Sequence, residues 1–158
     1  MDDEPGYGHI VVGVDGSELS RAALRWAARE AKLRNCPLDV VYGWQVSSEP
    51  RPPGDWGAGV APPLEAYEEQ AERRTRAIVD EVLPDGVGIE LSVHAIHKPA
   101  GRALLTLCPV ADLMVIGAKP HGRLAAWLVG SVSDEALKNA PCTVVVVRPS
   151  AGAGKADA

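Results

Sequence analysis

Short apolar runs alternate along the chain with longer stretches in which apolar residues recur every three or four positions. Residues 10–14 and 113–116 hold only apolar side chains and glycine, which is typical of parallel strands covered on both faces. Residues 38–44 and Thr143–Val147 are two further predicted strands. Between residues 87 and 95 apolar positions alternate with polar ones, which predicts a half-exposed strand at the edge of a sheet.

The longer stretches predict four amphipathic helices. The first begins after Ser17, a good helix cap, and ends near Arg34. The second spans residues 64–82 and follows a Pro- and Gly-rich loop at residues 47–63. Pro99 suits the first turn of the third helix. The apolar stripes consist of Ala23, Leu24, Ala27 and Ala31; Leu64, Tyr67, Ala71, Ile78 and Val82; Ala103, Leu104, Leu107, Cys108 and Ala111; and Ala136, Leu137 and Ala140.

Strands and helices therefore alternate, β-α-β-α-β-α-β-α-β, which predicts an α/β fold of three layers. We expect an open parallel five-stranded sheet with helices on both faces. With residues 87–95 at one edge, the expected strand order is 3-2-1-4-5. Ligands of such sheets bind where the strand order reverses, beyond the carboxyl ends of the strands. Residues 13–17 and 117–133 meet at this switch point, between the first and fourth strands.

Composition narrows the class of protein. The chain has 158 residues and a net charge of −5 without a Lys/Arg run, so nucleic-acid binding is disfavoured. No apolar stretch reaches the roughly 20 residues of a membrane helix, and the acidic N-terminus does not resemble a signal peptide, so we expect a cytoplasmic protein away from the membrane. We expect residues 1–148 to form one domain and residues 149–158 a disordered tail.

Cysteines and histidines form no pattern that indicates a metal site. The cysteines lie far apart and form no CxxC pair, so we predict neither a zinc site nor a redox pair but buried free thiols. His94 and His97 are three residues apart, which on a strand places them on opposite faces. His9 and His121 have no evident partner. The three cysteines are Cys36, Cys108 and Cys142.

A candidate phosphate site lies near the end of the fourth strand. That strand ends at Gly117, and Gly130-Ser131 opens the next helix. Backbone N–H groups at a helix start point outward and the helix dipole favours an anion there, so these segments predict phosphate binding. The alternative is an ordinary helix start, in which Ser131 is the cap and Asp134 completes a capping pattern.

Three segments together resemble the universal stress protein family over nearly all of residues 9–148. They are IVVGVDGS at residues 10–17, ADLMVIG at residues 111–117, and GSVS at residues 130–133 with the closing APCTVVVVR at residues 140–148. The resemblance implies the Rossmann-like fold of the adenine nucleotide alpha hydrolase-like proteins. It also implies a homodimer, which we expect to form by pairing of the edge strand Thr143–Val147 with its copy.

The resemblance further implies an adenine-nucleotide site. Many members bind ATP through the pattern G-x2-G-x9-G-[S/T], which this chain carries at Gly117 and Gly130-Ser131 with Pro120 in place of the second glycine. The ligand expected is ATP with Mg²⁺, or else AMP or cyclic AMP. Asp15 corresponds to the residue near ribose and adenine. The expected binding residues are Gly13, Val14, Asp15, Tyr42, Gly43, Gly117, Lys119, Gly122, Gly130, Ser131, Val132 and Ser133.

Aromatic residues at the end of the second strand are candidates for stacking on a base. Tyr42 and Trp44 are two residues apart, so a regular strand places both on one side, and packing in the core is the alternative. Trp127 is a candidate for a lid or a dimer contact. For Asp15 the alternative to ribose binding is a turn aspartate held by neighbouring N–H groups.

Pro120 keeps two functions open. Proline lacks an N–H and fixes φ near −65°, so if the family's glycine donates to phosphate, that bond is lost here, at about 1.5–3 kcal/mol or about ten- to a hundredfold in affinity. Against this, Gly122 can supply flexibility, and Lys119, His121 and Arg123 can supply positive charge to phosphates. The first function is a stress regulator that binds an adenine nucleotide, with at most slow ATP hydrolysis. The second is a dimeric interaction protein without a nucleotide. A dedicated enzyme is disfavoured because neither a general base nor a GxxxxGK[ST] loop accompanies the phosphate segment.

Overall fold

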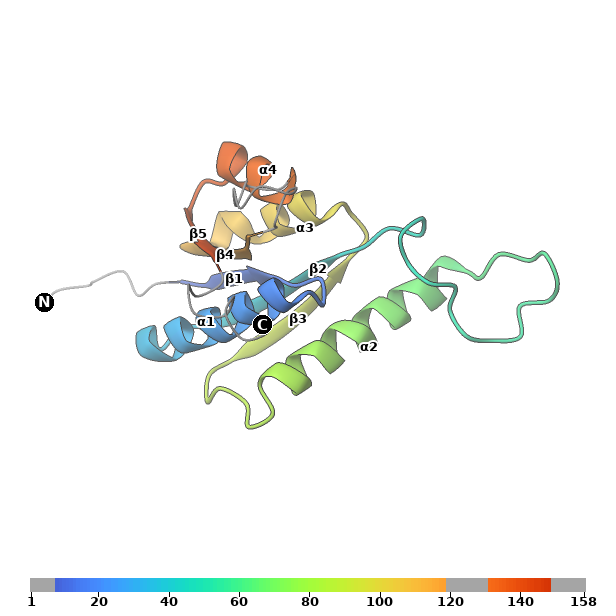
Figure 1. Ribbon diagram of the computed structural model, residues 1–158, viewed down its shortest axis with the longest axis horizontal. Coiled ribbons are helices and arrows are strands. Elements are labelled where there is room, and N and C mark those ends of the chain that lie inside the picture. The colour runs from blue at the N-terminus through green and yellow to red at the C-terminus, as the bar shows by residue number, and fades with distance from the viewer. Residues whose placement is uncertain (1–7, 119–130, 149–158) are drawn as a thin grey trace, which may run out of the picture.

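A computed structural model describes residues 8–118 and 131–148, which contain a five-stranded parallel sheet (Figure 1). The strand order β3-β2-β1-β4-β5 confirms the predicted topology, with the switch point between β1 and β4. Each neighbouring pair runs parallel, as crossover helices require. The strands are β1 (Ile10–Gly13), β2 (Leu38–Gly43), β3 (Leu91–Ile96), β4 (Leu113–Gly117) and β5 (Thr143–Val147).

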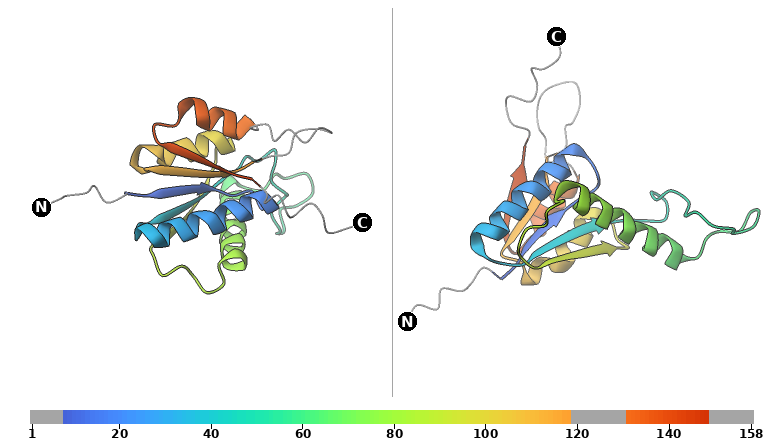
Figure 2. Two further views of the ribbon diagram at one scale, coloured as in Figure 1. Left: turned by 60° about the vertical axis from the view of Figure 1, so that its left-hand side comes forward. Right: turned by 90° about the horizontal axis from the view of Figure 1, so that it is seen from below.

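Helices cover both faces of the sheet. Figure 2 shows α1 and α2 on one face and α3 and α4 on the other, so the three predicted layers are confirmed. A short 3₁₀ turn, η1, follows α3 and leads into β4. The helices are α1 (Glu18–Arg34), α2 (Leu64–Val82), α3 (Ala100–Leu107) and α4 (Ser131–Asn139), and η1 spans Cys108–Val110.

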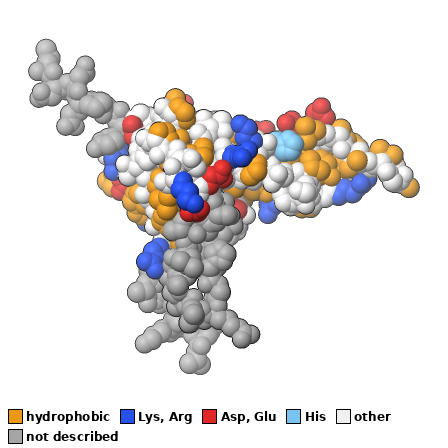
Figure 3. Space-filling model, turned by 90° about the horizontal axis from the view of Figure 1, so that it is seen from above, with side chains coloured by type: hydrophobic (Ala, Val, Ile, Leu, Met, Phe, Trp, Pro, Cys, Tyr) orange, Lys and Arg blue, Asp and Glu red, His pale blue; other side chains and the backbone are white. Residues whose placement is uncertain are grey.

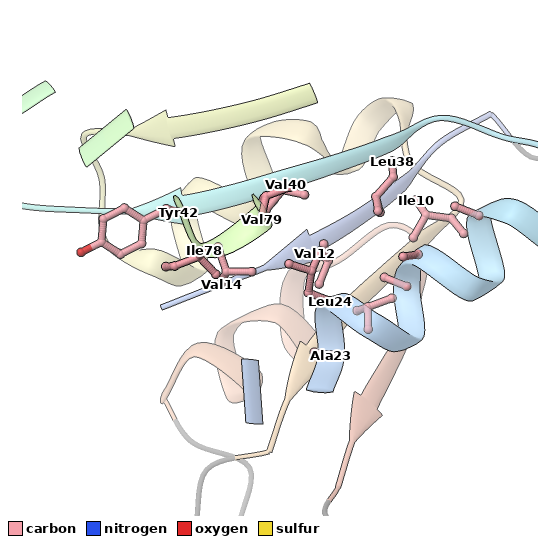
Figure 4. Close-up of a cluster of buried hydrophobic side chains, with 14 of the residues drawn as sticks. Ile10, Val12, Val14, Ala23, Leu24, Leu38, Val40, Tyr42, Ile78 and Val79 are labelled. Carbon is pink, nitrogen blue, oxygen red and sulfur yellow. The ribbon is translucent and has the colours of Figure 1, made fainter. Parts of the chain in front are cut away.

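The sheet separates two hydrophobic cores. The first core lies between the sheet and α1 and α2, where Ile10, Val12 and Leu24 are fully buried (Figure 4). The second core lies under α3 and α4 and contains Val11 and Met114 of the strands. Alternate residues of β1 therefore enter opposite cores, which explains why this strand is apolar at every position.

Helix α1 begins and ends as its sequence predicts. The Ser17 hydroxyl accepts a hydrogen bond from the Ser20 N–H at 3.2 Å, which caps the first turn. At the other end Asn35 has a left-handed φ of 51°, and its N–H bonds to the carbonyl oxygens of Ala31 and Lys32. Local hydrogen bonds thus fix both ends of α1, and the cap at Ser17 fixes the direction in which β1 leads into the helix.

Strand β3 is shorter than the alternating pattern predicts. It begins at Leu91 rather than Val87. Leu91 pairs with Leu38, and because β2 begins at Leu38, the residues before Leu91 have no strand residues opposite them. Gly88 has φ +69°, which belongs to a turn. Val87 nevertheless packs against the first core. The alternation of apolar and polar residues before Leu91 therefore reflects burial of one side of the segment, although the segment forms no strand hydrogen bonds.

Residues 44–63 form no helix or strand and project from the sheet together with the first turns of α2 (Figure 1). Gln70 of α2 donates a hydrogen bond to the Pro50 carbonyl at 2.8 Å, which ties the segment to the helix. Figure 3 shows hydrophobic side chains along this projecting part of the molecule, where Val46, Val60 and Leu64 are exposed. Among the described residues, no helix is both long and apolar enough to cross a membrane.

Candidate functional site

The ends of β1 and β4 approach each other at the predicted switch point. A Cβ atom on Gly117 would lie 2.6 Å from the Leu19 carbonyl oxygen and 3.0 Å from the Ser20 nitrogen. Glycine at this position therefore lets the end of β4 lie directly against the first turn of α1. That turn follows Asp15-Gly16-Ser17, so the structure brings the two predicted segments to one place.

Asp15 shapes the turn between β1 and α1. Its Oδ1 accepts a hydrogen bond from the Ser17 N–H at 2.9 Å, and its own N–H donates to the Ser20 hydroxyl at 3.2 Å. The turn role considered above is thus present. An ionised carboxylate accepts several hydrogen bonds, so this role is compatible with a contact to a ligand hydroxyl.

The predicted phosphate-binding helix start is α4. Ser131, Val132 and Ser133 occupy its first three positions, where backbone N–H groups have no partner within the helix. Asp134 also lies in the first turn and is paired with Lys138 at 2.7 Å, which offsets part of its negative charge. Lys119, Pro120, Gly122 and Gly130, together with His121, Arg123 and Trp127, lie outside the described residues, as does the predicted tail.

Packing explains two further glycines of the predicted site. A Cβ on Gly43 would lie 2.5 Å from the Ala100 Cα, so glycine allows α3 to sit against the end of β2. A Cβ on Gly13 would lie 3.0 Å from the tip of Leu104. The Val14 side chain is buried in the first core, so a ligand meets its backbone at most.

A cavity of about 420 Å³ opens beside Gly43. Its lining residues include the polar Gln45, Ser48 and Glu135 as well as Ala100 and Gly101. The cavity joins the end of β2 to the start of α3 and to α4. Gly43 is thus both a packing position and a lining residue, whereas Asp15 and Tyr42 do not line this cavity.

Tyr42 is held in a cluster of polar side chains that the sequence does not predict. Its hydroxyl donates to Oε1 of the buried Glu49, and Nη1 of Arg74 lies 3.3 Å from the same hydroxyl. The Arg74 guanidinium also lies 5.6 Å from the centre of the Tyr42 ring and 3.7 Å from Glu49 Oε2. Burial, and then the hydrogen bond to Glu49, raise the pKa of Tyr42 to about 12.

The aromatic candidates for base stacking are therefore engaged in packing. Tyr42 is only 8% exposed, and its ring already faces Arg74. Trp44 is 1% exposed and stacks on His97, with ring centroids 4.4 Å apart. Of the two interpretations of these residues, core packing is the one the structure supports.

Helical periodicity could have revealed part of the cluster around Tyr42. On α2 the buried positions Tyr67, Ala71 and Ile78 form a stripe, and Arg74 lies at its edge, with its side chain 45% exposed. An arginine at the edge of a buried stripe can reach a buried carboxylate, which needs a charged or hydrogen-bonding partner. Glu49 gives no such signal, because it lies in an irregular segment whose path the sequence does not define.

A second polar cluster lies near the amino ends of β1 and β2. The carboxylate of Asp39 is hydrogen-bonded to two histidines. Its Oδ2 lies 3.1 Å from His9 Nδ1, and its Oδ1 lies 2.9 Å from His94 Nε2. The prediction that His9 has no partner is wrong, whereas His97 is exposed and lies just beyond β3, outside the strand predicted at residues 87–95. The signal was Asp39 itself, a carboxylate inside an apolar strand. Among the described residues, no group of three or more such side chains is arranged to hold a metal ion.

The cysteines also differ from expectation. Cys36 and Cys108 are buried, as predicted, but Cys142 is partly exposed. Cys108 and Cys142, far apart in the sequence, lie side by side with their sulfur atoms 3.8 Å apart. Sequence spacing missed this pair because the parallel crossover from β4 to β5 brings the two residues together.

The fold and the switch-point segments define a doubly wound α/β protein with a candidate anion site where β1 and β4 end. The model of the universal stress protein family matches residues 6–148, and the chain belongs to this family. A universal stress protein of Mycolicibacterium smegmatis is 34% identical over 144 residues, which are 89% of this chain and 48% of that relative. The chain spans about half the length of the curated relatives it matches.

Solved structures show the same fold. UspA from Lactobacillus plantarum has a TM-score of 0.65 at 24% identity, over 90% of this chain and 98% of that chain. A universal stress protein solved in complex with cAMP has a TM-score of 0.59 at 23% identity, over 92% of this chain and 99% of that chain. These neighbours confirm the Rossmann-like architecture predicted from the alternation of strands and helices.

Proposed function

We propose that this chain is a stress-response regulator whose domain, residues 1–148, binds an adenine nucleotide at the switch point of the sheet. The observation that carries the proposal is the contact of Gly117 with the first turn of α1. It brings the end of β4 to the Asp15 turn, which is where ligands of doubly wound sheets bind. A structural neighbour bound to cAMP supports an adenine nucleotide as the ligand class.

In this proposal each segment has a separate task. The Asp15 carboxylate, oriented by the Ser17 N–H, accepts hydrogen bonds from the ribose hydroxyls. The N–H groups at the start of α4, at Ser131, Val132 and Ser133, receive a phosphate, and the helix dipole adds to the attraction. Gly13, Val14 and Gly117 present backbone at the strand ends, and Tyr42-Gly43 borders the base. Lys119, Gly122 and Gly130 complete the phosphate segment, and ATP brings Mg²⁺ as its counterion.

We further propose that two copies pair through β5. This strand is at the edge of the sheet, its valines are β-branched, and its residues other than Thr143 are half-buried. An edge of this kind exposes a row of N–H and C=O groups that a second copy satisfies by antiparallel pairing.

The test is a calorimetric titration of the purified chain with ATP, AMP and cAMP, after any co-purified nucleotide has been removed and identified by mass spectrometry. We expect binding of at least one of the three, and Asp15→Ala should weaken it about tenfold or more, as loss of a hydrogen bond with a charged group does. Pro120→Gly tests in parallel whether the proline limits affinity.

Two controls separate binding from folding. Ser17→Ala removes the α1 cap and costs about 1 kcal/mol of stability, but it leaves the Asp15 carboxylate in place. Asp85→Ala removes a carboxylate from an exposed turn at the far end of α2. Both variants should bind like the parent. If neither the parent nor Pro120→Gly bound any of the three nucleotides at millimolar concentration, the proposal would be refuted in favour of the interaction protein.

A further inference from the structure

Cys108 and Cys142 come from segments that the sheet places next to each other. Cys108 is the first residue of η1, which leads into β4, and Cys142 immediately precedes β5. The register pairs Leu113 at the start of β4 with Thr143 at the start of β5. The two thiols therefore meet at the amino ends of neighbouring strands, beside the second core.

The two sulfur atoms are close enough to be joined. They lie 3.8 Å apart, and a disulfide bond is about 2.05 Å long, so the sulfur atoms must approach by about 2 Å to form the bond. Both ends of the pair sit at junctions between elements instead of inside a strand or a long helix. Such junctions accommodate a small movement more readily than the sheet does.

The two thiols differ in their access to solvent. Cys108 is 1% exposed, whereas Cys142 is partly exposed. Burial and the neighbouring Cys142 raise the pKa of Cys108 to about 12, so the buried sulfur stays a thiol at neutral pH. A small oxidant therefore reacts first with Cys142, and the buried Cys108 is the thiol that can react with the oxidised Cys142.

We propose that Cys108 and Cys142 form an oxidative modification site that hydrogen peroxide converts to an intramolecular disulfide. The Cys142 thiolate attacks one peroxide oxygen, the O–O bond breaks, and water leaves with the proton of the thiol, so that Cys142 becomes a sulfenic acid. The Cys108 sulfur then attacks the Cys142 sulfur. The S–O bond breaks, and the hydroxyl leaves as a second water with the Cys108 proton. In sum two thiols and one peroxide give one disulfide and two waters.

The crosslink would join the end of α3 to the start of β5. The two cysteines are 34 positions apart in the sequence, and the segment between them includes β4 and α4, so the bond would close a loop that contains both elements. Cys36, in contrast, lies in the first core on the other side of the sheet and has no part in the pair. The site does not depend on the nucleotide proposal.

The test treats the reduced, full-length chain with a stoichiometric amount of hydrogen peroxide and follows thiol loss and mass. We expect two of the three thiols to disappear, the chain to become lighter by two hydrogens, and a reductant to restore both thiols. Tryptic digestion should yield peptides 103–123 and 139–155 joined through Cys108 and Cys142. Cys36→Ser should behave like the parent.

Two matched variants separate the roles of the cysteines. Cys108→Ser should still lose the Cys142 thiol, but its product should be a sulfenic acid that a dimedone probe captures. Cys142→Ser should lose thiols about tenfold more slowly than Cys36→Ser, because the oxidant must then reach a buried sulfur. Oxidation of the parent at Cys142 to a sulfinic acid without the joined peptides would overturn the proposal. So would equal thiol loss in Cys142→Ser.

Discussion

At the scale of single residues, Tyr42 shows how burial changes the chemistry of a side chain. It was a candidate platform for a base, but its hydroxyl donates to the buried Glu49 and its ring faces Arg74. The cluster links strand β2, the segment after it and helix α2. Its contribution to the site is indirect, because its contacts fix where the strand end and the following segment lie.

The alkaline stability of the protein should report on this phenol. Because the pKa of Tyr42 is raised to about 12, the folded chain holds this proton at pH values where the unfolded chain, with a pKa near 10, releases it. The contribution is therefore complete below pH 10 and is lost as pH rises toward 12, by about 2 kcal/mol. Denaturant unfolding of Tyr42→Phe should show a smaller decline over this window than the parent.

The same variant should be less stable near pH 8. Removal of the Tyr42 hydroxyl leaves Glu49 without its buried donor, at a cost of about 1–3 kcal/mol. Tyr67→Phe removes another buried phenol from the first core and leaves the Tyr42 contacts intact. If the Tyr42→Phe curve ran parallel to that of the parent from pH 10 to 12, the raised pKa would be wrong.

At the scale of elements, the sequence predicts more about strands and helices than about the contacts between them. Hydrophobic period predicts α1 and α2 at their observed bounds, with the Ser17 cap marking the start of α1, because these signals are local. The predicted start of β3 was wrong, because pairing with Leu38 decides where that strand begins and the alternation of apolar and polar residues does not. The candidate site followed from topology, whereas the Asp39 cluster joins residues 30 and 55 positions apart, which no local pattern relates.

Close packing of β4 against α1 gives a prediction at this scale. Gly117→Ala would place a Cβ 2.6 Å from a backbone oxygen, so the helix or the strand must move, at a cost of about 1–3 kcal/mol. Gly13→Ala is the matched control, because its Cβ meets the flexible tip of Leu104 at 3.0 Å. Thermal unfolding should rank Gly117→Ala below Gly13→Ala, and the reverse order would contradict the close approach.

At the scale of the whole molecule, the sheet has two edges of different character. β3 is half-buried along its whole length and forms one edge, while β5 forms the other. The proposed dimer uses β5, so the two edges can be compared directly. Val145 and Val93 are each the third residue of an edge strand, and both pack partly against the first core.

Sedimentation equilibrium should distinguish the two edges. We expect the parent to have twice the 16.6 kDa mass of the chain. Val145→Lys puts a charge on the pairing strand and should yield monomers, because a lysine on an edge opposes strand pairing. Val93→Lys disturbs the other edge at an equivalent position and should leave the dimer intact. Dissociation of both variants to the same extent would argue against pairing through β5.

The order of the strands also bears on how the chain folds during its synthesis. β1 ends up in the middle of the sheet, yet its partner β4 is made about a hundred residues later, since Ile10 pairs with Leu113. A chain emerging from the ribosome can first assemble β1, β2 and β3, with β1 as a temporary open edge. The central strand of the sheet is thus the one that waits longest for its second neighbour.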